Sequence, residues 1–387
     1  MKVKQIYTLV NSVTKEILGD TALIKEDLSN VVDVGKQIFD TENVDNYVKK
    51  LVNHIGKVVF VNRLYAGGVP SVLMDSWEFG SVLQKVTAEL PEAVENDAWA
   101  LADGESYDPN TFYQPKVSAK FFNSKTTFEI NLSFTEMQVK ESFSSAEQLN
   151  GFLSMLSTSV ENSMTVKLDA LIMRTINSFI GETIYNELYD AEAKAIDPTL
   201  GGIRAVNLLS LYNDTVEEKL TFDNAMINPD FIRFATYQIG LYSDRMAKIS
   251  TLFNIGKKER FTPKDMQHVV LLSDFARASE TFLRSNTYND EKVTLPDHES
   301  VPYWQGSGTS YAFEDISKID IKGSSGDVAI GGILGVIFDR DALGVSNLDR
   351  RVTTNYNAKA EFYTNFYKFD AGFFNDHNEN FVVFFIG

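Results

Sequence analysis

The side chains that could do metal or acid–base chemistry are few and scattered along this sequence. The four histidines are His54, His268, His298 and His377, and none is paired with another at the spacing of metal ligands. His377 lies within residues 376–379, whose order Asp-His-Asn-Glu resembles a chelating cluster but falls between two apolar segments. Polar residues in that position are typical of a turn. We therefore predict a polar turn there and no metal site.

Motifs for covalent catalysis and nucleotide binding do not occur either. The chain has no cysteine, which excludes disulfides, thiol catalysis and cysteine-ligated metals. It has no Gly-x-Ser-x-Gly elbow, although a Ser-His-Asp triad assembled from distant positions stays open. The Gly-Ser-Gly at 306–308 lacks the strand before it and the lysine after it that a phosphate cradle needs. Asp339 and Asp341 flank Arg340, and we expect a local ion pair there in preference to a catalytic dyad. No catalytic or cofactor-binding residue is predicted.

The charge of the chain is strongly acidic and unevenly spread. The net charge of −17 argues against a general nucleic-acid binder, which needs a basic surface. Residues 74–110 hold nine acidic side chains and one base, Lys85. This segment is either a solubilising face or an exposed extension whose acids meet a neighbour's bases or keep DNA away. No apolar run approaches the roughly 18 residues of a membrane span, and no signal-peptide pattern is present, so we expect a cytosolic chain without a membrane segment.

The elements that would position these residues begin with a predicted β-hairpin. The length suggests two or three domain-sized units, and glycines and a proline at 66–70 mark a hinge before the acidic segment. Apolar side chains at 128, 130, 132 and 134 alternate with polar ones, which predicts a strand with one buried face. We expect residues 117–121 to be its hairpin partner, joined through 123–125.

A long helix and a mixed α/β region follow. Overlapping capping-box patterns at 144–148, and apolar residues at helical spacing up to Phe179, predict a spine helix over 144–180, on the order of 50 Å long. Beyond it, Asn228-Pro229 is expected to open a helix, and buried strands are predicted at 269–272, 316–321 and 333–338. The chain ends in an apolar strand at 381–386 that we expect to lie in or against the sheet containing 128–134.

The order of these elements over most of the chain resembles that of a known family, and the closest similarity lies in the C-terminal part. The stretch 338–345 (Phe-Asp-Arg-Asp-Ala-Leu-Gly-Val), and the tail from 357–362 through 369–372 to 381–383, are similar to the major capsid proteins of tailed bacteriophages, which share the HK97 fold. The resemblance implies an α+β chain in which a discontinuous peripheral domain surrounds an α/β axial domain. The implied parts are an N-terminal arm (1–69), an E-loop (70–114), the peripheral domain (115–200) with its spine helix (144–180), the axial domain (201–345) and the returning peripheral strands (346–387).

The same resemblance implies a structural function and no enzyme activity. The chain would self-assemble into hexamers and pentamers of an icosahedral head that encloses double-stranded DNA without sequence-specific binding. Its further partners would be a separate scaffolding protein, since the N-terminal arm is short, with portal and decoration proteins and no membrane. The protein would be assembled in the host cytoplasm and would reside in the virion capsid.

Ten side chains are candidate contacts between subunits, mostly because they are charged or aromatic and fall in predicted extensions or loops. The tryptophans among them could equally be anchors in the core. Cross-linking through an E-loop lysine would need Lys85, and nothing in the sequence supports it. The candidates are Trp77, Glu78, Glu89, Glu92, Asp97, Trp99, Tyr107, Trp304, Arg350 and Arg351.

Three alternative functions stay open on the sequence. An encapsulin-type compartment shell has a similar fold but encloses protein cargo. A hydrolase could use carboxylates or a hidden triad in the 201–345 region, where His268 and Asp341 are the residues to test. A β-rich tail or receptor-binding protein is the third, although the long helix at 144–180 does not suit it.

Overall fold

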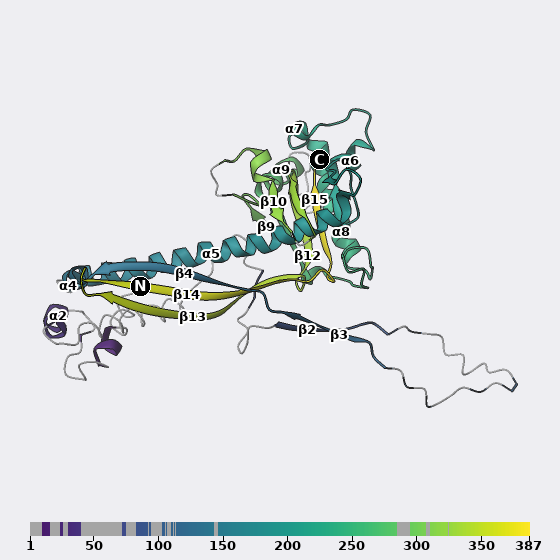
Figure 1. Cartoon of the computed structure of the whole chain (residues 1–387). Helices are drawn as coiled ribbons and strands as arrows, with labels where there is room; N and C mark the ends of the chain where they lie inside the picture. The colour runs from purple at the N-terminus through teal and green to yellow at the C-terminus, as the bar shows by residue number, and fades with distance from the viewer. Residues whose placement is uncertain are drawn as a thin grey trace. The chain divides into compact units, whose positions relative to one another are not determined.

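The computed structural model divides the chain into two compact units, which are described separately here (Figure 1). The first unit comprises residues 1–78, 125–174 and 345–372, and the second comprises 79–124, 175–344 and 373–387. Within these ranges the structure describes residues 10–15, 24–25, 30–39, 72–74, 83–91, 93, 103–104, 106, 110, 112, 114–142, 146–284, 295–306, 310–323 and 325–387.

The first unit is built on a four-stranded sheet in the order β1-β13-β14-β4. Its strands are β1 (Leu73–Met74), β13 (Leu343–Asn357), β14 (Phe362–Asn375) and β4 (Lys125–Thr135). β14 and β4 pair in antiparallel register along their length, from Phe362 opposite Thr135 to Gly372 opposite Lys125. β1 makes a short parallel pairing with β13. The helix α2 (Val31–Phe39) also belongs to this unit.

The alternation predicted for residues 128–134 is confirmed in β4, where every second side chain is at least partly buried. On the covered face Phe134 meets Tyr363 of β14, with ring centroids 5.9 Å apart, and Phe152 edge-on at 5.6 Å. On the other face Lys368 pairs with Glu129 across the strands at 3.1 Å. The sheet of the first unit therefore has one aromatic face and one polar face, as period-two patterning requires.

The predicted spine helix is confirmed and is longer than expected. α5 runs from Ala146 to Leu188, 43 residues, on the order of 65 Å. Gly181 does not end it, because one interior glycine costs only about 1 kcal/mol and the buried side chains continue at Ile184 and Leu188. A short helix, α4 (Glu136–Ser142), precedes it. Neither α5 nor any other helix in the described part of the chain is long and apolar enough to cross a membrane.

The second unit centres on a five-stranded sheet in the order β7-β15-β12-β8-β9 (Figure 1). Its strands are β7 (Ala205–Asn207), β15 (Phe381–Phe385), β12 (Ile333–Asp339), β8 (Gln267–Leu272) and β9 (Glu299–Val301). The other elements of this unit are β2 (Leu83–Ala88), β3 (Val117–Phe122), β5 (Tyr189–Asp190), β6 (Ala195–Ile196), α6 (Leu208–Asn213), α7 (Phe222–Ala225), α8 (Pro229–Met246), the 3-10 helix η3 (Lys264–Met266), α9 (Ser273–Arg284), α10 (Phe313–Ile316), β10 (Ile319–Lys322) and β11 (Asp327–Ile330).

Local predictions for this unit largely hold. Asn228 caps α8, since its side-chain oxygen accepts from the backbone N–H groups of Asp230 and Phe231. The strands predicted at 269–272 and 333–338 are confirmed as β8 and β12. The first residue of the strand predicted at 316–321 was wrong, because residues 313–316 form α10 and the strand begins at Ile319.

The last strand was expected in or against the sheet containing 128–134, and its place in that sheet was wrong. β15 pairs antiparallel with β12 and parallel with β7, in the sheet of the second unit, and does not join the sheet that contains β4. All five of its residues are buried. A strand buried on both faces needs an interior place in a sheet covered on both sides, whereas β4 alternates and belongs to a sheet with one polar face.

The predicted hairpin between 117–121 and 128–134 was also wrong. β3 pairs with β2, from Leu83 opposite Phe122 to Ala88 opposite Val117, while β4 pairs with β14. The two residues between β3 and β4 are Asn123 and Ser124. A two-residue hairpin loop favours positive φ angles and usually contains glycine, which this connection lacks. The chain therefore passes from one sheet into the other at this point.

Candidate functional site

The antiparallel pair β2–β3, called the ribbon below, has two faces of opposite character. Because side chains alternate along each strand, Lys85 and Lys120, which lie opposite each other, share one face. Val86, Val117 and Phe121 lie on the other face, with Ala88 and Ala119 between them. One face is thus equipped for charge interactions and the other is entirely apolar apart from Gln84, which lies opposite Phe121.

The apolar face of the ribbon is open to solvent. Val86 is 58% exposed, Val117 59% and Phe121 64%. Contiguous apolar groups on a soluble chain are uncommon unless they mark an interaction surface. Phe122, on the opposite face, is only partly exposed and lies with its ring centroid 5.0 Å from that of Phe374. One side of the ribbon therefore packs on the rest of the second unit, while the other side is exposed.

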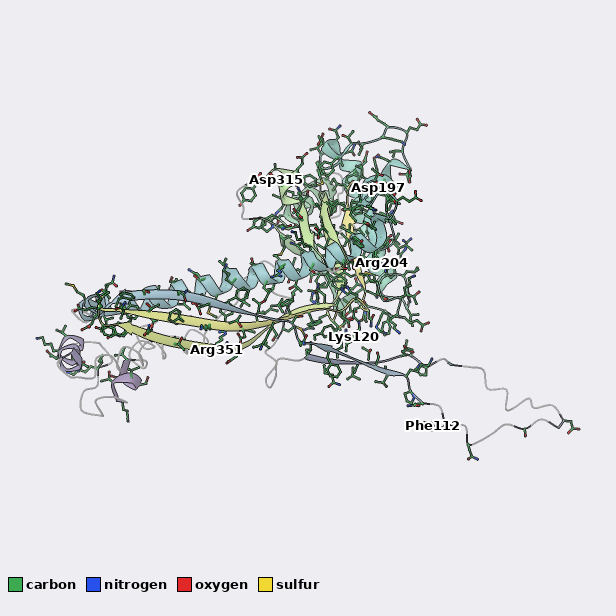
Figure 2. All side chains as sticks on the ribbon, viewed as in Figure 1. Phe112, Lys120, Asp197, Arg204, Asp315 and Arg351 are labelled. Atoms are coloured by element: carbon green, nitrogen blue, oxygen red, sulfur yellow. The ribbon has the colours of Figure 1, made fainter. Side chains whose placement is uncertain are left out.

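The charged face of the ribbon meets the turn at 376–379. The ammonium nitrogen of Lys85 lies 3.0 Å from Asp376 Oδ2 and 2.8 Å from Glu379 Oε1, and donates to the main-chain oxygen of Asp341 at 3.1 Å. An ammonium group has three protons, so each has an acceptor here. Lys120 binds the other oxygen of Asp376 at 2.7 Å (Figure 2 labels Lys120 on its strand).

A third base completes this cluster. Arg260 Nε lies 3.3 Å from Glu379 Oε2. Its loop is fastened to the same turn, because the N–H of Gly256 donates to the main-chain oxygen of His377 at 2.8 Å. We call the five charged side chains the ionic junction; they are Lys85, Lys120, Arg260, Asp376 and Glu379.

The ionic junction is buried at its acidic centre. The side chains of Asp376 and Glu379 are 2% and 8% exposed. Burial alone would raise the pKa of Asp376, but the hydrogen bond from Lys120 and the charge of Lys85 hold it below its usual value. Burial alone would lower the pKa of Lys85, and its bonds to Glu379 and Asp376 raise it instead. Removing one partner from a buried ion pair costs about 3–5 kcal/mol in other proteins, because the remaining charge is left buried without compensation.

The polar turn predicted at 376–379 is confirmed. The N–H of Glu379 donates to the main-chain oxygen of Asp376 at 3.1 Å, and the N–H of Asn378 to the side chain of Asp376 at 3.2 Å. The bases that bind this turn could not be identified from the sequence. The available signal was a pair of acids without a local base, together with a lysine on the inward face of each of two strands. That pattern does not identify which lysines bind the turn.

His377, in the same turn, makes stability depend on pH. Its ring centroid lies 4.9 Å from that of Phe179, and its buried Nδ1 has no hydrogen-bond partner among the residues that the structure describes. Burial lowers the pKa of His377, with Glu182 and Asp376 opposing and Lys120 reinforcing the shift. The unfolded chain takes up the proton at about pH 6.5, while the folded chain resists it until the pH is lower. Stability is therefore lost as the pH falls below about 6.5.

We expect acidification from about pH 7 to about pH 5 to lower the free energy of unfolding, and His377→Gln to reduce that loss. Urea denaturation at both pH values measures the free energy of unfolding of each protein. His298→Gln is the matched control, and its slope with pH should stay closer to that of the unsubstituted protein. Equal pH slopes for His377→Gln and the unsubstituted chain would contradict the assignment. Burial also lowers the pKa of His268, so part of the slope should remain in His377→Gln.

The structure places two of the candidate contact residues within the second unit. Trp304 is 1% exposed, and its Nε1 donates to the main-chain oxygen of Ile333 at 2.9 Å. It is a core residue, which corrects its inclusion among the contacts, because a fully buried ring cannot reach another subunit. Glu89 pairs with Lys258 of its own chain at 3.2 Å, and both side chains are 44% exposed.

Two further candidates lie in the first unit. Arg351 binds Asp370 at 2.9 Å and Asp349 at 3.0 Å, and Figure 2 labels it. Arg350 Nε donates to the side chain of Asn347 at 3.2 Å. Both arginines thus have partners within their own chain. Six candidates lie outside the described residues, namely Trp77, Glu78, Glu92, Asp97, Trp99 and Tyr107.

The acids flanking Arg340 do not form the predicted local ion pair. Asp339 is buried, and its carboxylate accepts from the hydroxyl of Thr262 at 2.6 Å and from the N–H of Asp341 at 2.9 Å. Burial raises the pKa of Asp339, and these hydrogen bonds oppose the shift. Its role is to join strand β12 to the loop at 262, because a buried carboxylate needs hydrogen-bond donors.

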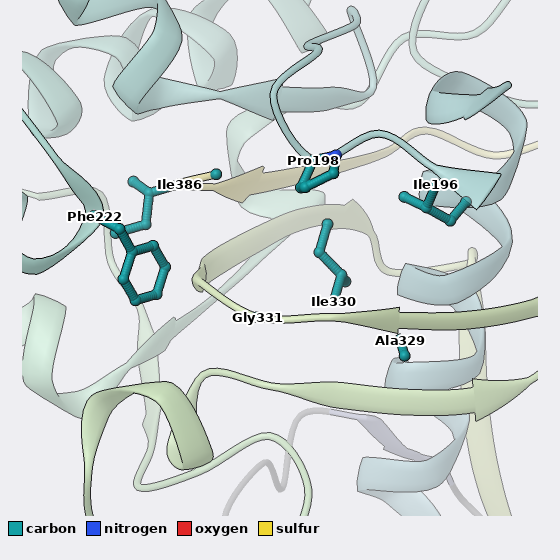
Figure 3. Close-up of a pocket in the computed structure, with 8 residues that line it drawn as sticks. Ile196, Pro198, Phe222, Ala329, Ile330, Gly331 and Ile386 are labelled. Atoms are coloured by element: carbon teal, nitrogen blue, oxygen red, sulfur yellow. The ribbon is translucent and has the colours of Figure 1, made fainter. Parts of the chain in front are cut away.

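A cavity of about 310 Å³ lies in the second unit (Figure 3). The side chains that line it are apolar. The lining residues are Ile196, Pro198, Phe222, Ala329, Ile330, Gly331, Ile386 and Gly387.

The ribbon is tied to its own unit by buried charges and exposes apolar side chains on its other face, and exposed apolar patches often mark interaction sites. Comparison with known proteins identifies the class. A family model described as "Phi29-like phage major capsid protein" matches residues 10–385, nearly the whole chain. The protein is thus the shell-forming protein of a phage head. It belongs to the Phi29-like phage major capsid protein family. This membership gives no support to the compartment-shell or hydrolase alternatives.

Solved phage structures are similar to this chain at low sequence identity. The chain of the Staphylococcus phage Andhra capsid shares 10% identity, with 84% of this chain and 86% of that chain covered and a TM-score of 0.48. The chain of the cyanophage P-SCSP1u capsid shares 10% identity, with 84% of this chain and 89% of that chain covered and a TM-score of 0.47. The chain of the mature bacteriophage PhiM1 capsid shares 8% identity, with 84% of this chain and 88% of that chain covered and a TM-score of 0.41. No curated protein matches the chain.

Proposed function

We propose that this capsid protein forms hexamers and pentamers that close an icosahedral head around double-stranded DNA. The apolar face of the ribbon is the observation that carries the proposal, and a second copy of the chain is the partner that covers it. Fully burying a valine or phenylalanine side chain contributes about 1.5–3 kcal/mol. Such a contact is modest in one pair of subunits, but a closed shell repeats it in every subunit, and repeated contacts reinforce one another.

We assign the parts of an HK97-type subunit as follows. The first unit, with its four-stranded sheet and the first part of α5, corresponds to the peripheral domain. The second unit, with its five-stranded sheet, corresponds to the axial domain, and β15 belongs there. The ribbon and the segment between its strands correspond to the E-loop. The chain passes between the two domains through β13 and β14, which supports a discontinuous peripheral domain. The last segment of that domain ends before β15.

The remaining partners follow from the same proposal. A net charge of −17 suits a shell that surrounds DNA without adhering to it, and binding to DNA would carry no sequence specificity. Scaffolding, portal and decoration proteins are the expected further partners, with assembly in the host cytoplasm and no membrane stage. The function needs no catalysis, so the chain is proposed to be a non-enzyme.

Electron microscopy of the purified protein tests this function. We expect particles of uniform diameter or free capsomers, with the corresponding mass by light scattering. Native particles from infected cells should contain DNA that resists nuclease until the shell is opened. A protein that stays monomeric at high concentration and shows no particles, with or without the accompanying phage proteins, would overturn the proposal.

A further inference from the structure

The ionic junction joins segments that lie far apart in the sequence to a single turn. Lys85 comes from β2, Lys120 from β3 and Arg260 from the loop before η3, while both acids lie in the turn directly before β15. Since β15 is an interior strand of the five-stranded sheet, the turn is anchored in the core of the second unit. The ribbon is thus tied to the buried core of its own unit.

The geometry of Lys85 is more specific than that of an ordinary surface ion pair. Its three acceptors come from Asp376, Glu379 and the main chain of Asp341, and its side chain is 17% exposed. The neighbouring pair of Lys258 and Glu89 is exposed on both sides. Exposed ion pairs adopt many geometries and contribute little to stability. A buried ion pair with all its hydrogen bonds made favours one arrangement of the two side chains.

Within the described residues the ribbon makes few contacts with the rest of its unit, so each of them matters for its orientation. It is only two strands wide, and a two-stranded sheet is at best marginally stable alone. Its outer face, with Val86 and Phe121, is more than half exposed in the free subunit and contributes little packing. The described contacts of the ribbon with the rest of its unit are the charged contacts at the inner face, the packing of Phe122 on Phe374, the exposed pair of Glu89 with Lys258, and a hydrogen bond from the N–H of Phe373 to the main-chain oxygen of Ser124.

We propose that Lys85 and Lys120 are positioning residues that hold the ribbon at one angle in the free subunit. Each copy then presents its apolar face in a single direction before it meets another copy. This inference rests on the proposed function for the step in which the face contacts a second copy. Fixing the ribbon beforehand removes the entropy cost of ordering it during association, which is the general benefit of preorganisation.

Spin-label distances in the free subunit test this directly. The chain has no cysteine, so Val117→Cys on the ribbon and Tyr237→Cys on α8 can be labelled cleanly; both native side chains are exposed. Double electron–electron resonance should give a narrow distance distribution in the otherwise unchanged protein. Lys85→Met, which keeps the length but not the charge, should make it at least about twofold broader.

The control is Lys264→Met, which removes a lysine from an exposed pair with Asp244 and should leave the distribution narrow. If Lys85→Met does not fold, Lys120→Met, which removes one ion pair, takes its place. A distribution as narrow in the folded junction variant as in the control would overturn the positioning role.

Assembly of the unlabelled proteins tests the second step. Lys85→Met should form shells more slowly than Lys264→Met at equal concentration. If Lys85→Met broadens the distance distribution but forms shells at the rate of the control, the link between positioning and assembly would be overturned. If the unsubstituted protein forms no shells, the proposed function fails, while the distance measurement still decides the positioning role.

Discussion

Replacing both Val86 and Phe121 with glutamate is expected to abolish shell formation while leaving the subunit folded. Both side chains are more than half exposed, so the free subunit loses little packing. In an assembled shell, two charges per subunit would have to be buried against apolar groups of a neighbour. Burying an unpaired carboxylate costs several kcal/mol, more than a modest subunit contact supplies.

The matched control keeps the surface apolar, with Val86→Ile and Phe121→Leu in the same chain. Sedimentation velocity and electron microscopy should show shells for the control and only subunits or small oligomers for the charged variant. Far-ultraviolet circular dichroism and the urea midpoint should be unchanged in both. Shells from the glutamate variant at the yield of the control would show that the apolar face of the ribbon is not a contact between subunits.

The second large effect is expected in the core, where Phe381→Ala should lower the free energy of unfolding by about 3–5 kcal/mol. The ring of Phe381 stacks on Phe179 of α5 with centroids 4.1 Å apart and lies 5.6 Å from Phe338 of β12. All three rings are buried. Removing one leaves a cavity between the helix and the sheet that rigid neighbours cannot fill.

Because total stability is typically about 5–15 kcal/mol, this loss approaches what the second unit can tolerate. Urea denaturation measures the effect, and the fluorescence of the buried Trp304 gives a signal from within the same unit. Phe112→Ala is the control, since Phe112 is 84% exposed and its loss should change stability by less than about 0.5 kcal/mol. A loss below about 1 kcal/mol for Phe381→Ala would mean that the stacked rings are not a centre of the core.

Elements whose burial is periodic could be predicted from the sequence. The alternation in β4 and the helical spacing in α5 both report which side chains face the core, and burial repeats with the geometry of the backbone. The end of α5 was missed because Gly181 looked like a terminus, and only packing against the rest of the second unit continues the helix to Leu188. Capping by Asn228 was predictable because it involves neighbouring residues alone.

Strand partners and the ionic junction could not be predicted in the same way. Every strand offers the same backbone donors and acceptors, so the sequence of β3 does not say whether β2 or β4 will pair with it. Lys85 and Glu379 are 294 positions apart, and nothing local in either distinguishes them from the other charged residues of an acidic chain. Their pairing depends on a sheet that must form first.

The acidic, cysteine-free composition, the spine helix and the polar turn at 376–379 could all be read from the sequence, and so could an order of elements similar to that of phage capsid proteins. These features depend on composition or on contacts between near neighbours. The place of β15 in the sheet of the second unit, the pairing of β2 with β3, and the binding of the ribbon lysines to the polar turn are evident only in the folded chain. These contacts join residues far apart in the sequence, and many strands and charged side chains could make them equally well until folding brings particular ones together.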